Sequence, residues 1–190
     1  MSVGDRGLAE RLVAELGRGQ VVQSCGQFTA EVPLADWTGA AELARDALGC
    51  GLFDHLSVHD HGHPAEAGLE WEVIAHVVAL PGCTGLLLST TLPAGGVLPS
   101  ITGVWAGAAW HEREAAEMAG IEVSGHPDLR PLLLAAGTGL HPLRKDTVLV
   151  SRAVRPWPGR MEPGESVEQP GAGRRRASTP GLPPEGWAQP

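Results

Sequence analysis

The sequence predicts an α+β fold: a small, mainly antiparallel sheet with helices packed on one face, followed by an extended C-terminal segment. Three segments repeat apolar residues at helical spacing, and five shorter runs have the composition of strands. Their order along the chain is α-β-β-α-β-β-β-α, with turn signals between neighbouring strands. This order favours hairpins in one sheet and helices gathered on one of its faces.

Each predicted element rests on its own pattern. The first helix places Leu8, Leu12 and Leu16 on one face, the second has Asp36 as its N-cap candidate, and the last ends at Gly120 as a C′ residue. The elements are expected at 5–16 (helix), 20–24 and 27–32 (strands), 36–48 (helix), 53–59, 69–80 and 84–92 (strands), and 108–119 (helix).

The charge of the chain argues against a nucleic-acid-binding protein. Residues 1–150 carry 8 Lys and Arg against 18 Asp and Glu, whereas residues 151–190 carry 6 against 4. Phosphate contacts need a basic face, which an acidic main body does not supply. No apolar run reaches the ~18–20 residues of a transmembrane segment. The N-terminus also lacks the pattern of a secretory signal, so we expect a cytosolic protein that is able to bind a membrane complex.

The cysteines exclude several kinds of site. Cys25, Cys50 and Cys83 form no CxxC pair. Disulfide frameworks and the usual thiolate spacings of zinc and iron–sulfur centres are therefore not expected.

The composition changes near residue 155. The last 36 residues contain 8 Pro and 6 Gly and few large apolar side chains, so they cannot bury enough surface to offset the entropy of ordering. We predict one domain over 1–154 and a disordered Pro/Gly-rich tail over 155–190.

Histidines crowd one stretch of the chain. His55, His59, His61 and His63 lie within nine residues of sequence, and imidazole with nearby carboxylates is a metal-binding composition. The stretch also falls between two predicted strands, where polar residues are expected anyway. We expect a solvated hairpin and no metal; a stand-alone metal-binding protein is the alternative that a metal analysis would reveal.

The most informative region spans residues 105–146. It offers acidic side chains on a helix and then two Gly/Pro-stiffened turns that present Arg130, Arg144 and Lys145. A phosphate loop is excluded because Gly137-Thr138-Gly139 lacks the G-K-[ST] end, and no Gly-x-Ser-x-Gly elbow is present. Arginine is favoured at ordered interfaces, so this region has the character of a docking surface.

Three motifs in this region carry a family resemblance. W-x-E-R-E-x-x-E-x-x-G-I at 110–121, G-H-P-D-L-R at 125–130 and H-P-L-R-K-D at 141–146 resemble the C-subunit family of respiratory complex I, the 30-kDa subunit of NADH:quinone oxidoreductase. The motifs occur in the family's order and at about its spacing.

The resemblance implies a non-redox subunit in the peripheral arm of a proton-translocating enzyme. Such a subunit docks on the D subunit, which helps form the quinone pocket with the B subunit. The resemblance also implies that FMN and iron–sulfur clusters belong to partner subunits and that no catalytic centre or cofactor is to be expected in this chain. The location implied is the cytoplasmic face of the membrane, as a peripheral protein. Related subunits occur in membrane-bound hydrogenases and formate hydrogenlyase-type complexes, which remain an alternative.

The resemblance also implies which residues form the interface. The motif residues with polar or charged side chains are expected to order it: Glu112, Arg113, Glu114, Glu117, His126, Asp128, Arg130, Arg144, Lys145 and Asp146.

Overall fold

The computed structural model describes residues 4–61, 71–80, 82–135 and 137–147, which lie in one compact unit. The predicted boundary at 154 and the tail lie outside the described residues. The helices are α1 (Arg6–Leu16), α2 (Trp37–Asp46, preceded by the short 3-10 helix η1, Leu34–Asp36) and α3 (Ala108–Ala119). The strands are β1 (Gln20–Ser24), β2 (Gln27–Glu31), β3 (Leu52–Asp60), β4 (Trp71–Ala79), β5 (Thr84–Leu92), β6 (Val97–Pro99) and β7 (Glu122–Ser124).

Five strands form one sheet in the order β1-β2-β5-β4-β3. β1 and β2, β3 and β4, and β4 and β5 are antiparallel pairs, and only β2 and β5 run parallel. Cys25 takes a positive φ of 49° beside Gly26 in the β1–β2 turn, as the predicted hairpin requires. The predicted α+β class with a mainly antiparallel sheet is confirmed.

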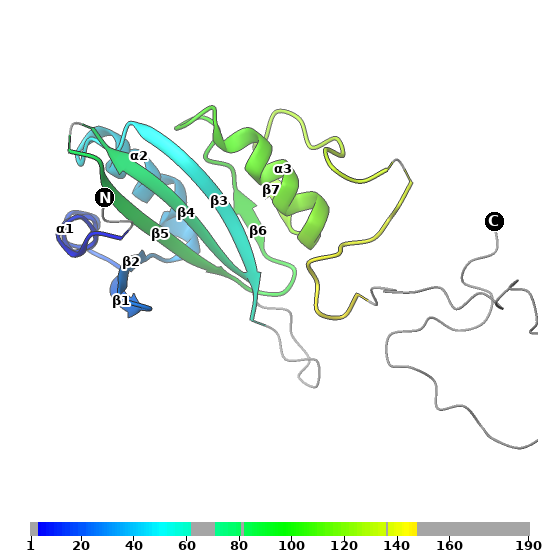
Figure 1. Ribbon diagram of the computed structural model, residues 1–190, viewed down its shortest axis with the longest axis horizontal. Helices are drawn as coiled ribbons and strands as arrows, with labels where there is room; N and C mark the ends of the chain where they lie inside the picture. The colour runs from blue at the N-terminus through cyan, green and yellow to red at the C-terminus, as the bar shows by residue number, and fades with distance from the viewer. Residues whose placement is uncertain (1–3, 62–70, 81, 136, 148–190) are drawn as a thin grey trace, which may run out of the picture. The chain divides into compact units, whose positions relative to one another are not determined.

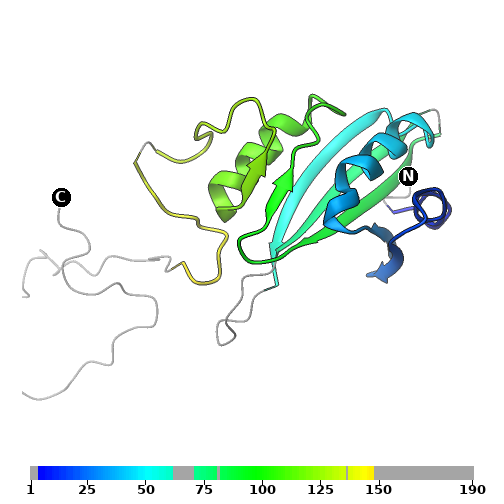
Figure 2. The same ribbon diagram turned by 180° about the vertical axis from the view of Figure 1, so that it is seen from behind.

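The core lies on one face of this sheet. Figures 1 and 2, which view the molecule from opposite sides, show α2 across one face of β3, β4 and β5, whereas no helix among the described residues covers the other face. Strand alternation explains the arrangement, because Trp71, Val73, Ala75 and Val77 all point to the same side and all are buried. α1 packs beside β1 and β2 through a stripe that includes Leu12.

α3 lies along the edge strand β3 instead of on the sheet face (Figure 1). The Trp105 indole N–H donates to the Cys50 carbonyl oxygen over 3.0 Å, and the Phe53 ring packs edge-on against the His111 ring. α3 ends at Gly120, whose φ of 72° confirms the predicted C-terminal glycine. This fixed edge position leaves the outer side of α3 exposed.

Besides the edge position of α3 and small shifts of strand ends, further details differ from the sequence predictions. The Asp36 side chain makes no capping hydrogen bond, because η1 runs directly into α2 and its carboxylate lies 3.6 Å from the Arg18 guanidinium. α2 ends at Asp46, two residues before the predicted end. The parallel pair of β6 and β7 was not predicted, since three-residue strands carry no readable periodicity.

In the described part of the chain, none of the helices has the length and apolar composition needed to cross a bilayer.

Candidate subunit interface

α3 organises the region that carries the sequence motifs. Ala108, Ala115 and Ala119 are buried together with Glu112, at the spacing of one helix face. The opposite face holds outward-facing residues, and the segment made of residues 125–135 and 137–147 runs over the borders of that face. The candidate interface is therefore the outer surface of α3 with this segment, which we call the α3 surface.

Glu112 is fully buried on the inner side of α3, opposite the α3 surface. The Ser100 hydroxyl donates to Oε2 over 2.6 Å, and the Ile101 N–H donates to Oε1 over 2.7 Å. Burial raises the pKa of this carboxyl, while the hydrogen bonds from Ser100 and Ile101 act in the opposite direction. Glu112 thereby ties α3 to the loop that follows β6.

His126 fixes the start of the segment 125–147. Its Nδ1 accepts the Asp128 N–H over 2.9 Å, and its Nε2 donates to the Ala109 carbonyl oxygen over 2.9 Å. These partners require a neutral ring protonated at Nε2. Both nitrogens are engaged and the side chain is 1% exposed, so this arrangement positions the backbone and leaves no nitrogen open to a substrate.

Arg113 and Glu117 hold the middle of the segment against α3. The Arg113 guanidinium donates to the carbonyl oxygens of Arg130 (2.7 Å) and Pro131 (3.1 Å). The Glu117 carboxylate accepts the N–H groups of residues 132, 133 and 134 at 2.7–3.0 Å. Arg113 and Glu117 lie one helical turn apart on α3. They therefore hold the same backbone turn through two separate sets of hydrogen bonds.

Replacing Glu117 by alanine is expected to release this turn. The amide of Leu133, with those of Leu132 and Leu134, lowers the pKa of the Glu117 carboxyl. The stabilisation that the ionised Glu117 carboxylate provides is therefore complete above pH 4.5, the ordinary pKa of the group. It is lost as the pH falls through the lowered pKa. At neutral pH we expect these three amides to exchange hydrogen at least about tenfold faster in Glu117→Ala.

The matched control is Glu114→Ala, which removes an exposed carboxylate from the same helix. Its exchange pattern over 132–134 should equal that of the wild type. Equal exchange in all three proteins would show that Glu117 does not anchor the turn.

The remaining predicted interface residues lie at the surface. Asp128 pairs with Arg130 and Asp146 pairs with Arg144, each over 2.6–2.7 Å, and the guanidinium in each pair lowers the pKa of its carboxyl partner. The Arg130 side chain is 84% exposed. The Lys145 N–H donates to the buried Asp60 carboxylate, which attaches the second turn to β3.

Apolar side chains at the α3 surface were not singled out from the sequence. Trp110 is 69% exposed and lies on the outer side of α3, three residues before Arg113. Large exposed apolar residues of the adjoining segment are Leu129, Leu133, Leu140 and Leu143. An exposed aromatic side chain with arginine nearby is typical of protein interfaces. The helical position of Trp110 opposite the buried stripe was the available signal.

The histidine-rich stretch divides into two groups. His59 and His61 lie close to Glu72 of β4, and His55 lies close to Asp54 and His76. Asp60 is turned to the other side of β3 and is buried. The structure thus brings together only some of the predicted histidines and adds residues from β4; His63 lies outside the described residues.

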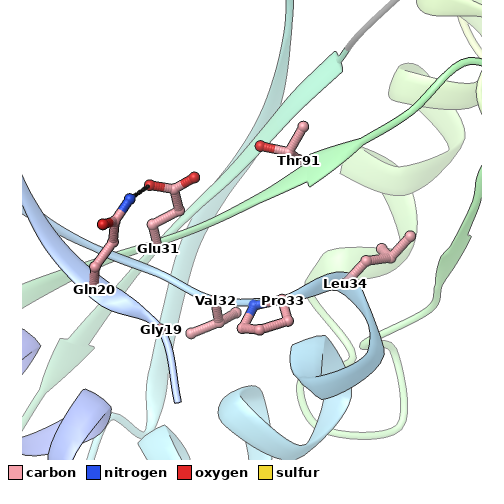
Figure 3. Close-up of a pocket in the computed structure, with 7 residues that line it drawn as sticks. All are labelled: Gly19, Gln20, Glu31, Val32, Pro33, Leu34 and Thr91. Atoms are coloured by element: carbon pink, nitrogen blue, oxygen red, sulfur yellow. Dashed lines mark hydrogen bonds between the residues drawn. The ribbon is translucent and has the colours of Figure 1, made fainter.

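A separate hollow of about 300 Å³ lies between β1, β2, β5 and η1 (Figure 3). Its carboxylate, Glu31, accepts a hydrogen bond from the Gln20 amide over 2.8 Å. Of the residues described around it, the others are apolar or neutral, and they include Thr91. This lining does not place a general base beside a nucleophile.

The fold is shared with a chain of a solved respiratory membrane complex. A chain in the solved structure of the membrane-bound sulfane sulfur reductase, an archaeal respiratory membrane complex, superposes with a TM-score of 0.61 at 16% identity, covering 74% of this chain and 83% of the other. The profile of the family described as respiratory-chain NADH dehydrogenase, 30 Kd subunit, matches residues 30–153. The chain belongs to this family, which confirms the resemblance seen in the motifs.

Relatives in several bacteria agree with this family. The C subunit of the NADH-quinone oxidoreductase of Aromatoleum aromaticum is 33% identical over 85% of this chain and 83% of its own length. The corresponding C subunit of Azorhizobium caulinodans is 35% identical over 64% of this chain, and the match spans 57% of that protein. The chain therefore covers little more than half of some relatives.

Proposed function

We propose that this chain is a non-redox subunit in the peripheral arm of a proton-translocating NADH:quinone oxidoreductase, and that it docks the D subunit through the α3 surface. One observation carries the proposal. The side chains of Glu112, Arg113, Glu117 and His126 are used inside the chain to hold a rigid segment, which leaves Trp110 and several leucines exposed around α3.

The same observation supports a structural role. Residues with catalytic potential in the motifs already have fixed hydrogen-bond partners, so we expect no catalytic centre in this chain. FMN and iron–sulfur clusters would reside in partner subunits, and NADH and quinone would bind elsewhere in the complex. We place the chain on the cytoplasmic face of the membrane, next to the B and D subunits.

Truncating the apolar anchors tests the proposal. Trp110→Ala should lower the affinity for the rest of the complex about 30-fold, because buried aromatic anchors carry most of the binding energy of an interface. Leu133→Ala should lower the affinity by a smaller factor, because it removes only an aliphatic contact of the same surface. The measurement is the amount of each variant that co-purifies with the native membrane complex, with partners identified by mass. The matched control is Leu80→Ala, which truncates a leucine of similar exposure (54%) directly after the C-terminal end of β4.

Arg130→Ala and Arg144→Ala should loosen assembly less than the apolar variants. Both guanidinium groups already pair with a carboxylate of their own segment, so their removal should mainly slow association and weaken its dependence on salt. Normal assembly of Trp110→Ala and Leu133→Ala would contradict the proposed surface. Co-purification with a nickel hydrogenase large subunit would replace the proposed complex by the hydrogenase-type alternative.

A further inference from the structure

A cluster of potential metal ligands lies where β3 ends and β4 begins. The strand register pairs His59 directly with Glu72, on the sheet face opposite α2. β3 ends at Asp60, and His61 is the next residue. The side chains of His59, His61 and Glu72 are thereby brought to one corner of the open face of the sheet.

The geometry of this cluster resembles a set of ligands around one ion. His61 Nε2 lies 3.2 Å from His59 Nδ1 and 2.9 Å from Glu72 Oε2, and the three atoms all lie within 4.8 Å of one another. Ligand atoms on a tetrahedral zinc ion, with bonds of about 2.0–2.1 Å, are separated by about 3.3 Å. Small side-chain adjustments would therefore bring all three atoms to bonding distance.

Hydrogen bonds alone do not satisfy all the polar atoms of this cluster. An imidazole nitrogen offers a single in-plane direction, yet His61 Nε2 has two neighbours within hydrogen-bond distance. A cation placed between the three atoms would satisfy all of them at once. The His61 side chain is 47% exposed and that of Glu72 is 30% exposed, so an ion and a completing water molecule could reach the site from solvent.

We propose that His59, His61 and Glu72 bind one divalent cation of the zinc class, which joins the end of β3 to the start of β4. Two imidazoles and one carboxylate favour Zn²⁺ over Mg²⁺ and Ca²⁺, which prefer oxygen ligands. The ion would cross-link the end of β3 to the start of β4 without redox chemistry. This inference goes beyond the proposed docking role and does not depend on it.

The second histidine group is the competing candidate. Asp54 Oδ2 lies 3.2 Å from His55 Nδ1 and 2.8 Å from His76 Nδ1, so this one oxygen is within hydrogen-bond distance of both imidazoles. The His76 side chain is only 2% exposed, so it is much less accessible to an ion than His61 is. These contacts favour a hydrogen-bonded group here, and His55 becomes the matched control.

The test is a Zn²⁺ titration of the full, untagged, metal-free chain against a competing chelator. We expect one ion per chain with micromolar or tighter affinity, and little competition from Mg²⁺ or Ca²⁺. His59→Gln, His61→Gln and Glu72→Gln should each weaken binding at least about tenfold, since even outer partners of metal ligands contribute 10–100-fold. His55→Gln should bind as the wild type does.

Two further measurements make the result decisive. Co²⁺ should give the intense visible bands of a tetrahedral complex in the wild type and lose them in His61→Gln, and Zn²⁺ should raise the midpoint of thermal unfolding only where the cluster is intact. Circular dichroism without metal confirms that each variant is folded. Unchanged affinity in His61→Gln, loss of binding in His55→Gln, or no stoichiometric binding by the wild type would each overturn the proposal.

Discussion

Replacing Glu112 by alanine is expected to lower the free energy of unfolding by about 2 to 3 kcal/mol. The truncation leaves the buried Ile101 N–H and the Ser100 hydroxyl without their acceptor and opens a cavity beneath α3. Urea denaturation of the purified chain at neutral pH measures the loss.

Glu112→Gln is the matched control, because it preserves the volume and an amide oxygen for the Ile101 N–H. We expect it to cost less than about 1 kcal/mol, since it also removes the penalty of a buried charge. A loss in Glu112→Gln as large as in Glu112→Ala would mean that the negative charge itself is required.

The same pair of proteins yields a pH dependence with a definite sign. Burial raises the folded-state pKa of Glu112 above its ordinary value of 4.5, so the folded chain holds this proton more tightly than the unfolded chain does. The stability of the wild type relative to Glu112→Gln should therefore fall as the pH rises from about 4.5 through the raised pKa, and stay constant above it.

Replacing Gly120 by alanine is expected to cost about 2 to 3 kcal/mol and to detach the segment that follows His141. Gly120 has a φ of 72°, and an added Cβ would lie 2.7 Å from Cδ2 of the His141 ring. The ring would have to move and would lose its 2.7 Å hydrogen bond from Nδ1 to the Glu117 carbonyl oxygen. The left-handed backbone adds its own penalty.

Gly17→Ala separates the penalty of the left-handed backbone from the penalty of the lost His141 contact. Gly17 also ends a helix, with a φ of 70°, but an added Cβ there would meet no atom within 4 Å. We expect a loss of about 1 kcal/mol from the backbone alone. Thermal and urea unfolding of both variants give the comparison, and equal losses at the two glycines would show that the His141 contact carries no energy.

The sequence located most elements because local patterns specify them. Leu8, Leu12 and Leu16 gave α1, the alternation from Trp71 to Val77 gave β4, and Gly120 marked the end of α3. β6 and β7 were missed, because each has three residues and is stabilised by a partner more than twenty residues away. Local propensity has no access to such pairings.

The motifs in the sequence determined the family, since they fix residue types and spacings that the family profile confirms. Which of their side chains face inward was decided by tertiary structure. Glu112 shares the helical spacing of the buried alanines, yet its burial depends on Ser100 and Ile101 arriving from a loop. The exposure of Trp110 likewise follows from α3 packing against the sheet edge. Glu72 joins His59 only through the β3–β4 register, because cross-strand neighbours are set by pairing and not by distance along the chain.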